Sequence, residues 1–264
     1  MMSNSQPIGF FDSGVGGTSI WSEVVQLLPQ ENSIYLADSK NAPYGEKPVD
    51  EIIALSKKNT EKLLEMGCKI IVVACNTATT NAIKYLRKNY QVPIIGIEPA
   101  IKPAALKSQT KAIGILATKG TLSSELFAKT TELYSKNINL IEVEGKGLVK
   151  LIEEGKQETP EMDLLLRSLL KPMLAAQIDH LVLGCSHYPY LLPKLKEILP
   201  ESVTIIDSGE AVARQTKNVL EHFNLLNKSH SKPVHQFYSN ADHNILARLL
   251  EAQKNNLEVS YLDF

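Results

Sequence analysis

The chain has 264 residues, of which 44% are hydrophobic and 22% are charged, with 14 glycines and 13 prolines. This composition excludes a disordered, collagen-like or coiled-coil protein, and at about 150 residues per domain the length predicts one large or two modest domains. Lysines and arginines number 28 against 29 aspartates and glutamates, so the formal net charge of −1 gives no electrostatic reason to expect nucleic acid or an anionic membrane as a partner.

Short β-branched runs alternate with amphipathic stretches along the chain, a pattern typical of α/β proteins with parallel sheets. In the first part, one helix is expected between Gly17 and Pro29, with Thr18 as its N-cap, and a second helix is expected to end at Gly67. The expected strands of this part are residues 8–11, 33–37, 69–74 and 92–97.

The same order of elements begins again at Lys111. The expected strands there are residues 112–116, 139–143, 180–184 and 203–207, each about 105 to 110 residues after its counterpart. The sequence therefore predicts an α/β fold of two pseudo-symmetric open-sheet domains with the active site in the cleft between them. Pro172 is expected to kink or split a helix over residues 161–177.

The tail from Ser208 onward has too few elements for a hydrophobic core of its own, so we expect it to pack onto the first half. Its expected elements are a helix at 210–225, a strand at 236–238, a helix at 242–253 and a strand at 257–261. The predicted domains are residues 1–98 together with 208–264, and residues 99–207.

The three cysteines, Cys68, Cys75 and Cys185, are too few for a disulfide framework, which favours a reducing compartment. The first residues lack the basic and apolar regions of a signal peptide, and no apolar run approaches the roughly 20 residues of a transmembrane helix. We therefore expect a cytoplasmic protein. Cys68 lies in a helix-to-strand connection without a polar motif and is expected to be buried filler.

Cys75 and Cys185 each follow an apolar strand directly, at the strand ends where open α/β sheets bind ligands. A helix that begins just after each cysteine would lower the thiol pKa from about 8.5 into the range of about 3.5–7.5. A dithiol switch is one use of such a pair, but the two are far apart in sequence. A metal site is a second, but only His187 lies beside either cysteine. The third is proton transfer at opposite faces of one carbon, which inverts its configuration.

The polar loops at the strand ends suit a small zwitterion. The segment from Asp12 to Gly17 offers a carboxylate, a hydroxyl and glycines that let backbone amides approach a ligand, but it lacks the spacing of a nucleotide-binding loop. His187 can tune Cys185. Neutral donors for a carboxylate are available at Tyr44, Gly45, Asn76, Thr77 and Ser186. The other histidines are expected to be structural or solvated: His180, His222, His230, His235 and His243.

The sequence resembles the bacterial glutamate racemases of the aspartate/glutamate racemase superfamily over nearly its whole length. The motifs that carry the resemblance occur in order: Ile-Gly-Phe-Phe-Asp-Ser-Gly-Val-Gly-Gly (8–17), Pro-Tyr-Gly (43–45), Ala-Cys-Asn-Thr-Ala (74–78) and Gly-Cys-Ser-His-Tyr-Pro (184–189). The family usually has threonine where this chain has Ser186, which keeps the hydroxyl but loses a methyl group.

The resemblance implies a cofactor-independent interconversion of L- and D-glutamate, without a metal, that supplies D-glutamate for peptidoglycan synthesis, and it suggests a homodimer. It implies that Cys75 and Cys185 exchange the roles of base and acid, with Asp12 assisting the first and His187 the second. The residues implied to line the substrate site are Asp12, Ser13, Tyr44, Gly45, Asn76, Thr77, Glu153, Ser186 and His187.

Two other functions stay open. The chain could racemise aspartate or a related amino acid, because two thiols dictate the inversion and not the side chain of the substrate. It could also be a non-catalytic α/β binding module, although the presence of both thiols speaks against this. An enzyme without an electron-sink cofactor needs a closed, water-poor cleft to stabilise a carbanion-like species, so we expect the two domains to close around the substrate.

Overall fold

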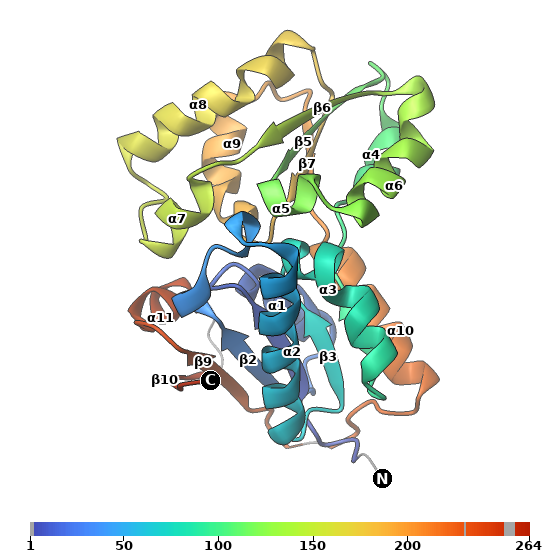
Figure 1. Ribbon diagram of the computed structural model, residues 1–264, viewed down its shortest axis with the longest axis vertical. Coiled ribbons are helices and arrows are strands. Elements are labelled where there is room, and N and C mark those ends of the chain that lie inside the picture. Colours follow the sequence, from blue (N-terminus) through green and yellow to red (C-terminus); the bar gives the residue numbers. More distant parts are fainter. Residues whose placement is uncertain (1–2, 230, 251–256) are drawn as a thin grey trace.

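The computed structural model describes residues 3–229, 231–250 and 257–264, which form two α/β units stacked end to end (Figure 1). The first unit contains a sheet with the strand order β10-β9-β2-β1-β3-β4, and the second a sheet with the order β6-β5-β7-β8. All neighbouring strands in both sheets run parallel. The expected α/β class with two open sheets is therefore confirmed. No described helix has the length and apolarity needed to cross a membrane.

The first unit is built from both ends of the chain. Its strands are β1 (Ile8–Asp12), β2 (Ser33–Ala37), β3 (Ile70–Val73), β4 (Ile94–Gly96), β9 (His235–Ser239) and β10 (Leu257–Tyr261). Its helices are α1 (Thr18–Leu27), α2 (Val49–Glu65), α3 (Asn76–Asn89), α10 (Gly209–His222) and α11 (Asn244–Leu250), with short 3₁₀ turns η1 (Ser39–Asn41) and η2 (Tyr44–Glu46).

The second unit lies in the middle of the chain. Its strands are β5 (Ala112–Ala117), β6 (Asn139–Glu144), β7 (His180–Gly184) and β8 (Thr204–Ile206). Its helices are α4 (Ile101–Lys107), α5 (Lys119–Leu122), α6 (Glu125–Tyr134), α7 (Leu148–Glu153), α8 (Pro160–Ala175) and α9 (Leu192–Ile198), with 3₁₀ turns η3 (Ser135–Asn137) and η4 (Tyr188–Leu191).

Alternation along β1 explains how the first sheet is covered on both faces. Phe10 packs into a core that contains Trp21 of α1 and Leu220 of α10, whereas Phe11 packs into a second core with Leu63 of α2. Successive residues of a strand point to opposite faces, so an uninterrupted apolar run such as this one is buried on both sides. The sheet is thus sandwiched between α1 and α10 on one face and α2 and α3 on the other.

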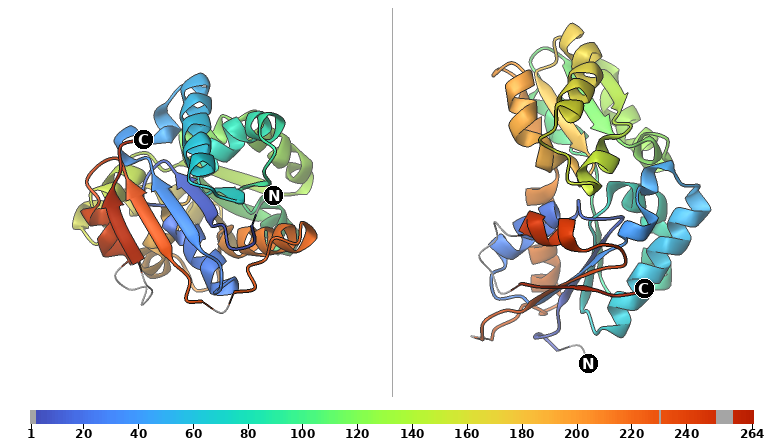
Figure 2. Two further views of the ribbon diagram at one scale, coloured as in Figure 1. Left: turned by 90° about the horizontal axis from the view of Figure 1, so that it is seen from below. Right: turned by 90° about the vertical axis from the view of Figure 1, so that its left-hand side faces the viewer.

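The tail completes the first sheet on one side. β9 pairs with β2 in the register Ser33 to His235, and β10 pairs with β9 beyond it (Figure 2, left). On this topology we propose the domain boundaries expected from the sequence, 1–98 with 208–264 and 99–207. The helix expected over 242–253 is observed from Asn244 to Leu250, and its expected last residues lie outside the described part of the chain.

The N-cap expected for α1 is wrong, and of the two outcomes expected at Pro172 the split is absent. Gly17, not Thr18, is the N-cap of α1, and the Thr18 hydroxyl donates instead to the carbonyl of Val15. Pro172 does not split its helix, because α8 continues through it to Ala175. The proline lies only one turn from the end of α8, where its missing N–H costs a single helical hydrogen bond.

Candidate active site

Cys75 lies between the end of β3 and the start of α3. Its Sγ accepts a hydrogen bond from the Ala78 N–H at 3.4 Å, and its S–H donates to Ser13 Oγ at 3.8 Å. Burial, and then the charge of Asp12, nevertheless raise the thiol pKa well above its usual range. The expectation that the helix would lower this pKa is wrong, because one amide hydrogen bond is outweighed by desolvation and a neighbouring carboxylate. Cys75 is therefore a protonated thiol that can donate a proton.

Cys185 follows the last residue of β7, and its surroundings differ from those of Cys75. No α-helix begins directly after it, since the 3₁₀ turn η4 precedes α9, which starts at Leu192. The helix start on which a lowered thiol pKa depended is therefore present at Cys75, whereas no α-helix provides it at Cys185. Cys185 Sγ forms a hydrogen bond with His187 Nδ1, at 3.7 Å. A ring nitrogen thus stands where a backbone amide stands at Cys75.

His187 is buried among groups that favour its charged form. Its Nε2 lies 2.5 Å from Glu153 Oε1, and its Nδ1 lies 4.0 Å from Asp12 Oδ2. Burial alone would lower the pKa of the imidazole, but the hydrogen bonds with Cys185 and Glu153 and the charge of Asp12 raise it well above its usual range. At neutral pH the ring is therefore an imidazolium, which can donate from both nitrogens and stabilises a thiolate beside it.

Asp12 connects the two units. Its Oδ2 accepts from the Gly17 N–H at 2.9 Å, and its Oδ1 accepts from the Ser186 hydroxyl of the second unit at 3.2 Å. Burial raises the pKa of this carboxyl, and the charge of His187 opposes the rise. The charge of Cys185 also raises the pKa of Cys75, so both sulfur atoms share one electrostatic environment. The structure thus places Asp12, Ser186 and His187 at one buried centre with the two cysteines.

The glycines of the first loop make room for side chains of the protein itself. A Cβ at Gly14 would lie 2.0 Å from Glu153 Oε1, and a Cβ at Gly16 would lie 2.2 Å from His187 Nδ1. The Val15 N–H donates to Glu153 Oε1 at 2.7 Å. In this structure Glu153 and His187 thus lie against the glycines, and the approach of backbone amides to a ligand stays a prediction.

Asn76 and Thr77 stand at the start of α3, next to Cys75. Asn76 is 2% exposed, and within the described part of the chain neither atom of its side-chain amide has a hydrogen-bond partner. A buried amide without partners is costly, so this one is available to a ligand. The Thr77 hydroxyl lies 2.8 Å from that of Thr118, across the boundary between the units.

Tyr44 and Gly45 lie in η2, against the second unit. The Tyr44 hydroxyl donates to Asp38 Oδ2 at 2.5 Å, so it is not free to bind a carboxylate. A Cβ at Gly45 would lie 2.7 Å from the Cβ of Thr118. At these two positions the backbone, and not the tyrosine hydroxyl, is therefore the group that can face a substrate.

The sequence did not single out Asp38, Ser39 and Thr118. Asp38 fixes Tyr44, and the Ser39 hydroxyl donates to Glu153 Oε2 at 3.2 Å. Thr118 directly follows β5, just as Ser13 directly follows β1, and the two positions are 105 residues apart. The internal repeat could therefore have been used to predict that Thr118 lies at the site. Asp38 and Ser39 also follow the end of a strand, β2. Polar residues at that position are the sequence feature that could have indicated them as site residues.

Glu153, and not its neighbour Glu154, lies at the site. Glu154 points away and pairs with Lys156 at 2.5 Å near the surface. Cys68 is buried, and burial raises its pKa to about 12, which suits an inert side chain. In the described part of the chain, no group of three or more His, Cys, Asp or Glu side chains has an arrangement that would hold a metal ion.

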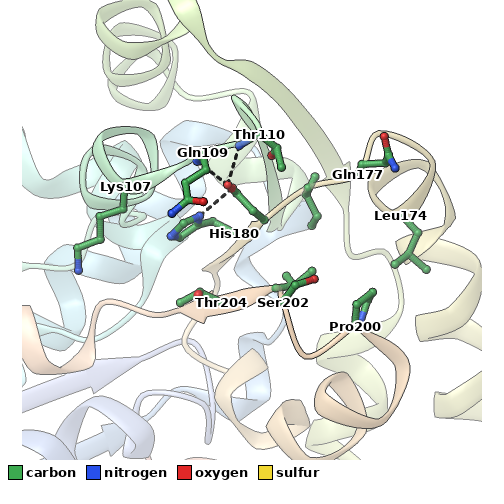
Figure 3. Close-up of a pocket in the computed structure, with 12 residues that line it drawn as sticks. Lys107, Gln109, Thr110, Leu174, Gln177, His180, Pro200, Ser202 and Thr204 are labelled. Carbon is green, nitrogen blue, oxygen red and sulfur yellow. Dashed lines mark hydrogen bonds and ion pairs between the residues drawn. The ribbon is translucent and has the colours of Figure 1, made fainter.

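The remaining histidines lie outside this centre. His180 lines a cavity of about 570 Å³ where β7 and β8 begin, whereas Cys185 follows the end of β7. There Asp179 accepts hydrogen bonds from the His180 ring and from the backbone N–H groups of Gln109 and Thr110 (Figure 3). None of the predicted site residues lines that cavity. His235 is buried beside Trp21, and His222 is exposed. His230 lies outside the described residues.

The chain belongs to the Asp/Glu/hydantoin racemase family, whose model matches residues 15–216. It is accordingly an isomerase, an amino-acid racemase. A glutamate racemase of Cupriavidus pinatubonensis is 45% identical over 239 residues, covering 90% of this chain and 88% of the relative. A glutamate racemase isoform from Bacillus anthracis has a similar structure, with a TM-score of 0.88, 30% identity and coverage of 99% and 98% of the two chains. The Francisella tularensis glutamate racemase, solved in complex with D-glutamate, matches with a TM-score of 0.83, 27% identity and coverage of 97% and 98%.

Proposed function

We propose that this enzyme interconverts L- and D-glutamate, with Cys75 and Cys185 transferring protons at opposite faces of Cα. The observation that carries the proposal is the difference between the two cysteines. Cys75 has a raised thiol pKa, whereas Cys185 lies 3.7 Å from an imidazolium nitrogen of His187. One acid and one base are what inversion by proton transfer requires.

In one direction, Cys185 as a thiolate takes the α-proton, and the electron pair of the broken C–H bond stays on Cα. Cys75 then gives its S–H proton to the opposite face, which forms the new C–H bond with inverted configuration. This turnover leaves Cys185 protonated and Cys75 as the thiolate. The reverse reaction runs from that state with the roles exchanged, with Asp12 beside Cys75 and His187 beside Cys185 as the assisting groups.

The substrate groups would be held by side chains that are already in place. The Asn76 amide lacks protein partners in the described part of the chain, and Thr77, Ser13 and Ser186 present hydroxyls close by. Fixed donors of this kind stabilise the charge that develops as the α-proton leaves. Together with the backbone of Tyr44 and Gly45 they offer separate places for two carboxylates.

The substrate can enter only if the two units separate. Cys75 and Cys185 are 4% and 6% exposed, so both residues are buried. Contacts that cross the boundary include Ser19 Oγ to the Ser186 carbonyl at 2.8 Å and Val15 N to Glu153 Oε1 at 2.7 Å. We infer a cycle in which these contacts open for glutamate and close again, which excludes water from the carbanion-like intermediate.

The test is circular-dichroism turnover of both glutamate enantiomers, beside both enantiomers of aspartate, without added cofactor. We expect turnover of glutamate in both directions and little or none of aspartate. Faster turnover of aspartate would move the assignment to that substrate. No α-proton exchange with any amino acid in D₂O would favour a non-catalytic binding module.

We also propose that the D-glutamate is used for peptidoglycan synthesis, as the resemblance to bacterial glutamate racemases suggests. The test is expression of this chain in a bacterium that requires D-glutamate for growth. We expect growth without added D-glutamate. Failure to grow with the active enzyme present would contradict this role and leave the racemase activity standing.

A further inference from the structure

Asn240 is a buried side chain that connects the C-terminal segment to the loop between β2 and α2. It follows β9 directly and is 3% exposed. Its Nδ2 donates to Asp38 Oδ1 at 2.5 Å, and its Oδ1 accepts from the Lys40 N–H at 2.9 Å. Both ends of one amide thus bind the same short loop segment, on either side of Ser39.

The loop that Asn240 holds reaches the active site by two routes. Asp38 accepts from the Tyr44 hydroxyl at 2.5 Å, which fixes η2 and the backbone of Tyr44. Ser39 donates to Glu153 Oε2 at 3.2 Å, and Glu153 Oε1 lies 2.5 Å from His187 Nε2. The first route leads to the backbone of Tyr44, which is proposed to bind the substrate. The second leads to His187, the hydrogen-bond partner of Cys185.

We propose that Asn240 is a positioning residue for the racemase reaction, acting through the 38–46 loop. This inference rests on the proposed function, because the loop matters only if Tyr44 and His187 serve glutamate turnover. The C-terminal segment is then more than an edge of the first sheet, since it supplies the residue that fixes the loop.

Asparagine is suited to this position because its amide has a donor and an acceptor on one planar group. Residue 240 has to give Asp38 a donor and the Lys40 N–H an acceptor to hold the loop at both points. Alanine would remove both bonds and leave the buried Asp38 Oδ1 with the Asn41 amide as its remaining side-chain donor. Aspartate has the same shape, but it would face the Asp38 carboxylate without a hydrogen to donate.

The experiment compares Asn240→Ala and Asn240→Asp with wild type in steady-state racemisation of both glutamate enantiomers. The matched control is Ser239→Ala, the preceding residue of the same strand. Ser239 is 1% exposed, and its hydroxyl accepts only from the Ala241 N–H at 3.2 Å among the side-chain bonds of the described chain. Thermal unfolding of all variants is measured in parallel.

We expect both Asn240 variants to raise KM by about tenfold or more, with a smaller fall in kcat, while Ser239→Ala stays within about twofold of wild type. Asn240→Asp keeps the shape of the side chain, so it reports on the hydrogen bonds even if Asn240→Ala folds poorly. Asn240→Gln, which retains both amide groups, should recover part of the lost affinity.

Wild-type KM and kcat in both Asn240 variants would overturn the inference. The inference would also be overturned if KM were unchanged and total activity fell only in proportion to the fraction of folded protein. That result would indicate a purely structural role. Wild type in the same assay separates the two failures. Absence of glutamate turnover by wild type contradicts the proposed function, whereas unchanged variants beside an active wild type contradict only the role of Asn240.

Discussion

His187 and Glu153 are joined across 34 positions of the sequence by a hydrogen bond of 2.5 Å between Nε2 and Oε1. This bond orients the ring so that Nδ1 faces Cys185 Sγ at 3.7 Å, and it helps to raise the pKa of His187 although burial acts in the opposite direction. In the proposed mechanism, Glu153 therefore fixes the orientation of the His187 ring and favours its charged form.

Replacing Glu153 by glutamine should lower kcat/KM for glutamate by about tenfold or more at neutral pH. Without the carboxylate the pKa of His187 falls, so the alkaline limb of the pH profile should move to lower pH. Glu154→Gln is the matched control, because Glu154 pairs with Lys156 near the surface. Equal kinetics for the two variants would contradict the role of Glu153.

A methyl group at Gly16 should displace His187. The added Cβ would lie 2.2 Å from Nδ1, and a displacement of about 1 Å costs on the order of 100-fold in rate. We expect Gly16→Ala to keep its far-ultraviolet circular dichroism and lose racemisation. Gly209→Ala is the control, since the nearest atom to its Cβ is the Cγ of Glu23, a flexible side chain, at 2.9 Å. Wild-type turnover by Gly16→Ala would contradict the prediction, because it would show that the loop accommodates the methyl group without displacing His187.

Breaking the buried ion pair of Lys69 and Glu31 should destabilise the first unit strongly. Lys69 Nζ lies 2.6 Å from Glu31 Oε2, and the two side chains are 0% and 3% exposed. Removing one partner leaves a buried charge, so Glu31→Ala should lower the free energy of unfolding by about 3–5 kcal/mol. The control is Glu125→Ala, whose ion pairs are exposed and which should unfold in urea close to wild type. Equal losses in the two variants would contradict the prediction.

His235 should make the protein less stable in mild acid. Burial lowers its pKa from 6.5 to about 4, so between these values the unfolded chain binds the proton and the folded chain does not. Stability from this group is thus lost as pH falls through that window, by about 2 kcal/mol between pH 7 and pH 5. His235→Gln should flatten this part of the urea-unfolding profile, and His222→Gln, at an exposed position, should not. An unchanged slope in His235→Gln would rule out His235 as the cause.

Much of the fold could be predicted because it depends on local patterns. The strands β2, β7 and β10 occupy the predicted residues, and the repeat located the two strand ends that carry Cys75 and Cys185. The resemblance supplied the further candidate site residues, of which the structure places Ser13 and His187 directly at the two cysteines, and their roles stay predictions. These successes follow from apolar periodicity and from motifs that are contiguous in the chain.

The rest depends on contacts between distant residues. The predicted decrease of the Cys75 pKa is wrong because it considers only the amides at the start of the following helix. Burial and the charge of Asp12 raise this pKa instead. The glycines at 14 and 16 have their meaning only once Glu153 and His187 are placed against them. Asn240 lies 202 positions from Asp38, and no local pattern links the two.

The most direct test of the two-thiol proposal is proton exchange and racemisation by Cys75→Ser and Cys185→Ser, each measured with L- and D-glutamate in D₂O. Wild type should incorporate solvent deuterium at Cα while it racemises either enantiomer. Each serine variant should stay folded and lose racemisation in both directions by about 100-fold or more, because one face of Cα then lacks its acid or base. Near-wild-type racemisation by either variant would contradict the proposal that both thiols are needed.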